Sequence, residues 1–194
     1  MIPPLGDRLS PLPFEVIEHS SRPPSPWGGY QLCLADIPDC THLVIVQDDV
    51  EPVPNFAGAV TQIAKRHAST PVCLFLSKVP AGAAQRARRA LQKGYQYVRL
   101  YPAPFVPLVG MLWPRHKACE FLEWTKTDVQ LRGYPNPRAD DGICAQWVKR
   151  TKQEVLVACP SLVEHLGVPS IKGLRTVEGW KAMQLAEDGL DHPW

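Results

Sequence analysis

Two short, uninterrupted apolar runs place the strongest constraint on the fold of this chain. They occupy His42–Gln47 and Val72–Ser77, and each has the length of a strand. Fully apolar runs of this length are typical of strands that are buried on both faces of a sheet. Between them, Asn55 can cap a helix that runs to about His67, because apolar residues recur there at helical spacing. The sequence therefore predicts a strand, a helix and a second strand.

The same alternation continues along the chain. We expect further strands at Phe14–Glu18, Tyr95–Tyr101 and Glu154–Cys159, and helices at Gly28–Ile37, Ala81–Lys93, Arg115–Lys126, from Asp140 or Asp141 onward, and at Val177–Glu187. Alternating strands and helices predict an α/β fold, with a mostly parallel central sheet flanked by helices. A length of 194 residues fits a single domain over residues 1–194.

Composition excludes several classes of protein. Hydrophobic residues make up 45% and charged residues 21%, which suits a packed core, and a net charge of +2 argues against a strongly basic nucleic-acid wrapping protein. The uncharged run Tyr101–Pro114 is shorter than the roughly 20 apolar residues of a membrane span and is broken by prolines. The N-terminus lacks a signal-peptide pattern. We therefore expect no membrane span and a cytoplasmic location. The six cysteines form no CxxC pair, which favours buried, reduced thiols over a zinc site or disulfides.

A pair of adjacent carboxylates, Asp48 and Asp49, directly follows the first apolar run. Ligands of open α/β sheets bind at the carboxyl ends of the strands, and hard divalent cations prefer carboxylate oxygens. A cation held there could bridge the diphosphate of a substrate. The alternative is a simple turn, in which the Asp side chains bond the following backbone.

Together with its neighbours, this pair resembles the metal-binding DxD region of GT-A fold glycosyltransferases. Four segments match motifs of that family in the correct order: Val46–Pro52 with Phe56, the glycine-containing Leu108–Trp113, the xED-like Ala139–Gly142, and Pro160–Gly167 with its histidine. The resemblance covers roughly Phe14 to Ser170. It implies a GT-A-like (Rossmann-like) domain that acts as a metal-dependent, inverting glycosyltransferase and moves a sugar from a nucleotide-sugar donor to a hydroxyl acceptor.

The resemblance also implies roles on the donor side. Asp49 would be the direct ligand of Mn²⁺ or Mg²⁺, and His165 would be a further ligand or would contact the diphosphate. Asp48 would lie near the ribose or would support the metal site without binding the ion directly. The acidic triplet of the family begins here with Gln47, which can hydrogen-bond ribose hydroxyls but binds a cation weakly.

On the acceptor side, the resemblance implies that Asp141 is the general base and that Asp140 orients it. Gly110 and Trp113 would line the acceptor. Other interpretations remain open: Asp140 and Asp141 also suit the start of a helix, which favours acidic residues. His165 could be an ordinary loop histidine, Gly110 could relieve a tight backbone contact, and Trp113 could belong to the core.

The N-terminal, nucleotide-binding half would be reduced, since only 47 residues precede Asp48 and the family places two βα units before this strand. Residues Ile2–Arg8 look like the end of the first strand with its nucleotide-contacting loop. Arg8 would then reach the diphosphate, and Glu18 would contact the nucleobase.

The expected helix Ala81–Lys93 is basic: it carries Arg86, Arg88, Arg89 and Lys93, and no acidic residue lies between Lys78 and Arg99. It is either a solvated face or a phosphate-contacting patch for an anionic acceptor. The acceptor would be a glycan or modified DNA, on which some small bacteriophage enzymes act.

Two other functions compete with sugar transfer. The first is a non-catalytic module that binds a sugar nucleotide or nucleic acid on a degenerate GT-A fold. The second is a metal-assisted phosphoesterase that uses the same acids, with Glu51 and Glu164 also available.

Overall fold

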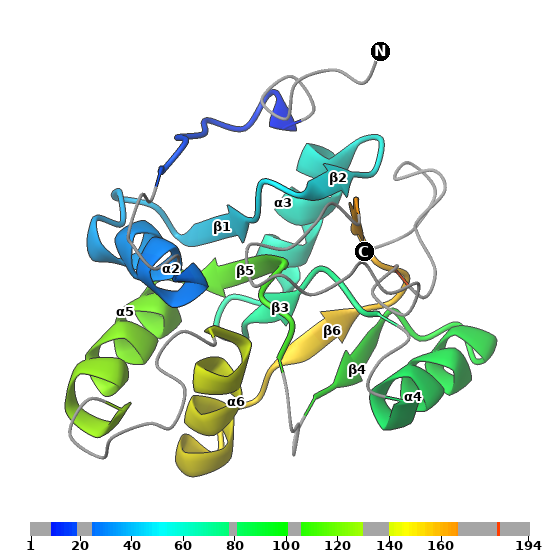
Figure 1. Cartoon of the computed structure of the whole chain (residues 1–194). Helices are drawn as coiled ribbons and strands as arrows, with labels where there is room; N and C mark the ends of the chain where they lie inside the picture. Colours follow the sequence, from blue (N-terminus) through cyan, green and yellow to red (C-terminus); the bar gives the residue numbers. More distant parts are fainter. Residues whose placement is uncertain are drawn as a thin grey trace.

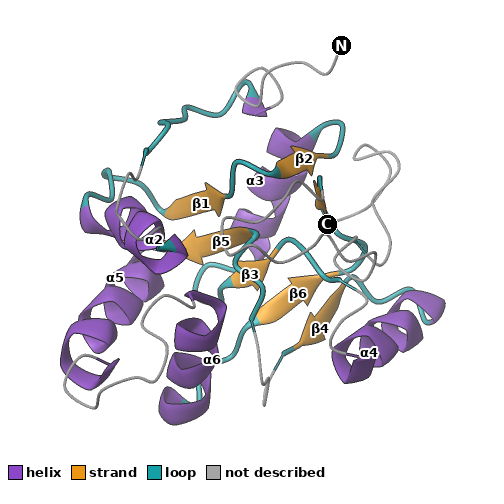
Figure 2. Cartoon of the chain, in the orientation of Figure 1, coloured by secondary structure: helices purple, strands orange, loops and turns teal. Residues whose placement is uncertain are grey.

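The computed structural model describes residues 9–18, 25–77, 81–100, 106–129, 140–166 and 182. Within these residues the chain has an α/β fold, in which helices flank a five-stranded mixed sheet and two short strands pair separately (Figures 1 and 2). The expected α/β class is confirmed. None of the described helices combines the length and the apolar character that a membrane crossing requires.

The central sheet is built from strands far apart in the sequence. In spatial order they are β1 (His42–Val46), β5 (Gly110–Pro114), β3 (Val72–Cys73), β6 (Leu156–Ala158) and β4 (Tyr97–Arg99). Strand β5 is antiparallel to both β1 and β3, and β4 is antiparallel to β6. The pairing of β3 with β6 is parallel.

The expectation of a mostly parallel sheet is therefore wrong. Strands β4 and β5 follow each other in the sequence, and both run opposite to β1, β3 and β6. They are not neighbours in the sheet, so each pairs with strands of the other direction. The alternation of strands and helices in the sequence does not say which strands become neighbours, and β5 enters the sheet in the opposite direction to β1 and β3.

Five expected helices are confirmed. They are α2 (Pro26–Ala35), α3 (Phe56–Arg66), α4 (Ala81–Gln92), α5 (Arg115–Trp124) and α6 (Asp140–Thr151). Helices α2, α5 and α6 contact one another, α3 contacts β5, and α4 packs beside β4 (Figure 1). The expected helix at Val177–Glu187 lies outside the described residues.

The expected strand at Phe14–Glu18 is wrong. These residues form no strand, and Phe14, Val16 and Ile17 are exposed. Apolar and β-branched residues favour a strand only where a neighbouring strand and a core face are available. Within the described residues before β1, the regular element is instead helix α2, which begins where the Ser25 hydroxyl accepts a hydrogen bond from the Gly28 N–H at 3.1 Å.

An aromatic cluster joins β5 to three helices. The Trp113 ring stacks on Phe121 of α5 at a centroid distance of 5.3 Å and lies 5.6 Å from Trp147 of α6. Its Nε1 donates a hydrogen bond to the Tyr30 hydroxyl of α2 at 2.7 Å. Trp113 is 0% exposed. The side chain is thus a central part of the core, and its one polar group is satisfied inside it.

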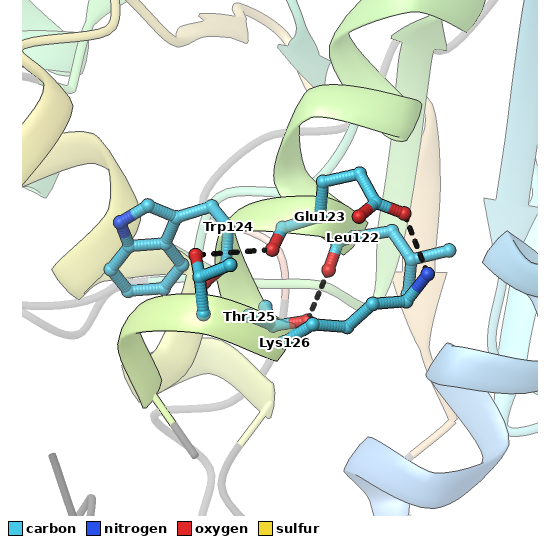
Figure 3. Close-up of polar contacts among 6 residues, drawn as sticks. Leu122, Glu123, Trp124, Thr125 and Lys126 are labelled. Atoms are coloured by element: carbon cyan, nitrogen blue, oxygen red, sulfur yellow. Dashed lines mark hydrogen bonds and ion pairs between the residues drawn. The ribbon is translucent and has the colours of Figure 1, made fainter. Parts of the chain in front are cut away.

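Helix α5 widens into a π-helix, η1 (Thr125–Val129), at its carboxyl end (Figure 3). The buried Thr125 hydroxyl donates a hydrogen bond to the Leu122 carbonyl at 2.7 Å, and Lys126 pairs with Glu123 at 2.6 Å. Threonine hydroxyls that bond back to helix carbonyls commonly bend or alter a helix. These local bonds satisfy groups that the end of the α-helix leaves open.

All six cysteines are free, but the expectation that they are buried is only partly confirmed, since Cys33 and Cys40 are half-buried and Cys119 is exposed. Cys73, Cys144 and Cys159 are buried, and burial raises the pKa of the Cys73 thiol to about 12. These three thiols behave as small core residues, because the thiolate is strongly disfavoured where they lie.

Gly110, the first residue of β5, lies where the two sheets meet. A Cβ atom at this position would approach Val163 Cγ2 to 3.1 Å and Leu74 Cβ to 3.5 Å. Its carbonyl accepts a hydrogen bond from the Leu74 N–H at 2.9 Å. The glycine therefore allows Val163 to pack directly on the backbone of β5.

We expect Gly110→Ala to lower the free energy of unfolding by about 1–3 kcal/mol, because the added methyl group overpacks this contact. Chemical denaturation of the wild type and variant measures the loss. In the Gly110→Ala/Val163→Ala double variant the loss should be smaller than the sum of the two single losses. Additive losses would mean that Val163 is not what excludes a side chain at position 110.

Candidate functional site

The site expected from the sequence lies at the carboxyl end of β1. Gln47, Asp48 and Asp49 directly follow this strand and lead into β2 (Val50–Pro52). Because β1, β3 and β6 run in the same direction through the sheet, this end also holds the carboxyl ends of β3 and β6 and the starts of β5 and β4. Segments distant in sequence thus meet around the acidic triplet.

The pairing of β2 with β7 (Val163–His165) brings His165 to Asp49. Val50 lies opposite His165 in this antiparallel pair, and the Leu166 N–H donates to the Asp49 carbonyl at 2.8 Å. His165 Nε2 then lies 3.3 Å from Asp49 Oδ2. Both side chains are only partly exposed, at 18% and 22%.

The second carboxylate oxygen of Asp49 receives no hydrogen bond from the residues that the structure describes. Asp49 Oδ1 is buried and forms no hydrogen bond with the described residues. Burial raises the pKa of the Asp49 carboxyl above its usual value; His165 opposes this shift, and the neighbouring Asp48 adds to it. A buried carboxylate oxygen with no donor is costly, which makes Asp49 a group that a bound cation or proton would stabilise.

A second cluster anchors the start of α6 to the ends of β1 and β5. The Gln47 side-chain amide donates to Asp140 Oδ2 at 3.3 Å, and the Gln47 N–H donates to the Val109 carbonyl at 3.0 Å. The Leu108 N–H donates to Asp141 Oδ1 at 2.9 Å. Asp140 Oδ1 also accepts a bond from the Asp141 N–H at 3.0 Å, and Asp140 is 3% exposed. Asp140 thus stabilises the helix start and ties it to β1.

The two clusters share the tripeptide Gln47–Asp49 but remain separate sets of contacts. Asp49 meets His165, Gln47 meets Asp140, and Asp141 meets the backbone of Leu108. Among the described residues, no group of three or more His, Cys, Asp or Glu side chains is placed to hold a metal ion. Asp49 and His165 are two potential ligands that lie together, so a cation bound beside them would need further ligands.

Other residues implied by the family resemblance have different positions. Asp48 is exposed beside Asp49. Glu18 is exposed in the segment that forms no strand, and the described contacts do not join it to either cluster. Arg8 lies outside the described residues.

Gly110 and Trp113 are both buried. The structure therefore gives these two residues packing roles, and their contact with an acceptor stays a prediction. For Gly110 the reason is the close approach of Val163, and for Trp113 it is the aromatic core.

Sequence reasoning gave no structural role to Glu164. Its Oε1 accepts hydrogen bonds from the His165 N–H at 2.9 Å and the Ala182 N–H at 2.8 Å. Glu164 thereby joins Ala182 to the strand that carries His165. Local patterns do not predict strand β2, because it is three residues long and ends in Pro52. Strand β7 lies within Pro160–Gly167, the segment that by resemblance is the closing strand and loop of the family.

Comparison with known proteins returned no match, either among models of protein families or among curated proteins.

We expect Asp49→Asn to raise the melting temperature at neutral pH in the absence of divalent cations. The native state disfavours the ionised Asp49, so the stability of the wild type falls as the pH rises from below 3.8 through the raised native pKa. The difference between variant and wild type should shrink toward zero below pH 3.8. Thermal melts across this pH range measure it.

The matched control is Asp48→Asn, which removes the neighbouring exposed carboxylate. This variant should raise the melting temperature less than Asp49→Asn. Equal shifts in the two variants would show that general charge repulsion, and not burial of Asp49, is the cause.

Proposed function

We propose that this chain is a metal-dependent, inverting glycosyltransferase with a GT-A-like domain. The observation that carries the proposal is the convergence of the four motif segments at one end of the sheet. Hydrogen bonds and the Asp49–His165 contact join residues 47–49, 108–109, 140–141 and 165 there.

On the donor side, Asp49 and His165 would hold Mn²⁺ or Mg²⁺. The buried Asp49 Oδ1 has no donor among the described residues, so a cation would relieve its desolvation. When bound, the ion supplies neutralising charge for the diphosphate that leaves. The exposed Asp48 would meet the donor ribose. Gln47 would act indirectly, since its amide holds Asp140.

On the acceptor side, Asp141 would take the proton of the acceptor hydroxyl. The hydroxyl oxygen then forms a bond to the anomeric carbon of the sugar, while the bond from that carbon to the diphosphate oxygen breaks. The Leu108 N–H fixes one oxygen of Asp141, and Asp140 fixes the start of its helix. A base on the face opposite the leaving group inverts the anomeric carbon, as in inverting glycoside hydrolysis.

A non-catalytic module that binds a sugar nucleotide is the second candidate. It is favoured by Gln47, which stands in place of an acidic residue of the family motif, and by the small number of metal-binding side chains near Asp49 within the described residues. Such a module would bind the donor through the same residues but would not use Asp141.

The test combines a binding and a turnover measurement. We expect nucleoside diphosphates with Mn²⁺ to raise the melting temperature of the wild type, and mass spectrometry to detect slow hydrolysis of one nucleotide sugar in a donor screen. Asp141→Asn should keep the thermal shift and lower turnover by about 10²–10⁴-fold. Asp49→Asn should lose the Mn²⁺-dependent part of the shift.

Asp39→Asn is the matched control, because Asp39 is fully exposed and pairs with Arg115 near the other end of β1. It should change neither measurement. A thermal shift without turnover by the wild type would favour the binding module. Hydrolysis of a generic phosphodiester that is lost in Asp49→Ala would favour the phosphoesterase. Normal turnover by Asp141→Asn would remove that residue from the role of base.

A further inference from the structure

An open groove between α4 and β4 lies away from the acidic site. It has a volume of about 280 Å³ and is lined by Arg86, Arg89, Ala90, Lys93, Tyr95, Tyr97 and Val98. Strand β4 is at one edge of the five-stranded sheet and β1 is at the other (Figure 1). Four inter-strand spacings, or roughly 19 Å, separate the two sites across the sheet.

Three cations line one wall of this groove. Arg86, Arg89 and Lys93 follow one another at intervals of three and four residues, so they project from one face of α4 and its end along roughly 10 Å. All three are exposed, and none forms an ion pair with a described residue. Neighbouring like charges on a helix destabilise it. A bound polyanion would remove this repulsion.

An exposed aromatic ring stands beside these cations. Tyr95 is 60% exposed and lines the groove. Tyr97 also lines the groove, and its ring is held in place by edge-on packing against His67 at a centroid distance of 4.4 Å. Bases of single-stranded nucleic acids stack on such rings while cations follow the phosphate backbone.

We propose that this groove binds single-stranded nucleic acid, with phosphates on Arg86, Arg89 and Lys93 and a base stacked on Tyr95. A row of cations beside a flat ring suits a chain in which phosphates alternate with bases. An acidic peptide would match the cations but would leave Tyr95 without a partner. The proposal stands whether or not the acidic site transfers sugars, because it uses none of the same residues.

Fluorescence anisotropy with a short labelled oligothymidylate and with its RNA counterpart tests the proposal. The full chain should bind at low salt, with affinity falling as salt rises. Three phosphate contacts predict a slope of about −2 for the logarithm of the binding constant against that of the salt concentration. The two labelled strands show whether DNA or RNA is preferred, and either preference supports the binding of single-stranded nucleic acid in this groove.

Two sets of variants assign the binding to this groove. Arg86→Gln/Arg89→Gln should reduce the magnitude of the salt slope by about 1.4. The charge-matched control Lys149→Gln/Lys152→Gln, at the exposed carboxyl end of α6, should leave it unchanged. Tyr95→Ala should weaken binding by about 5- to 150-fold, and Tyr95→Phe should restore it. Thermal melts confirm that each variant is folded.

Three outcomes would overturn the proposal. They are no binding of either strand by the folded wild type, equal losses in the arginine variant and its lysine control, and binding that is unaffected by Tyr95→Ala. If Tyr95→Ala leaves binding unaffected and polyphosphate binds as tightly as the oligonucleotide, the groove is a general anion-binding surface.

Discussion

The antiparallel placement of β5 between β1 and β3 is the constraint on which the rest of the structure depends. All five residues of β5 are buried, and Trp113 joins the strand to α2, α5 and α6. The register that pairs Val46 with Gly110 puts the residues before β5 beside those after β1. The candidate site is therefore a consequence of core packing, because the strand that centres the hydrophobic core also positions the backbone that holds Asp141.

Structural and functional roles coincide at the start of α6. Asp140 stabilises the helix start and bonds Gln47, while Asp141 accepts a hydrogen bond from the Leu108 backbone. The two residues that begin α6 thus also tie the helix to the residues after β1 and before β5. Asp49 differs, because its buried Oδ1 has no partner among the described residues. The fold therefore supplies hydrogen-bond donors to Asp140 and Asp141, but within the described residues it supplies none to Asp49 Oδ1.

Strong local patterns predicted much of the secondary structure. The apolar run at His42–Gln47 became β1, and helical spacing after Asn55 became α3, because burial of one face decides both elements. The run Val72–Ser77 forms a strand only at Val72–Cys73, although its residues are buried. The strand predicted at Phe14–Glu18 does not form, because none of the described strands pairs with this segment. The Asp49–His165 contact was implied by family resemblance, whereas local patterns could not reveal the β2–β7 pairing that produces it.

The sequence by itself determined that strands and helices alternate around a core, and that acids follow the first apolar run. It did not determine the burial of that run, which forms the edge strand β1 with Ile45 as its one buried residue. Hydrophobic periodicity and residue chemistry are local properties, so a single sequence carries them. Only the tertiary structure decided the direction of β5, the burial of Trp113 and the meeting of Gln47 with Asp140. Each of these depends on contacts between residues far apart in the chain, and their free energy arises only when the strands and helices pack together.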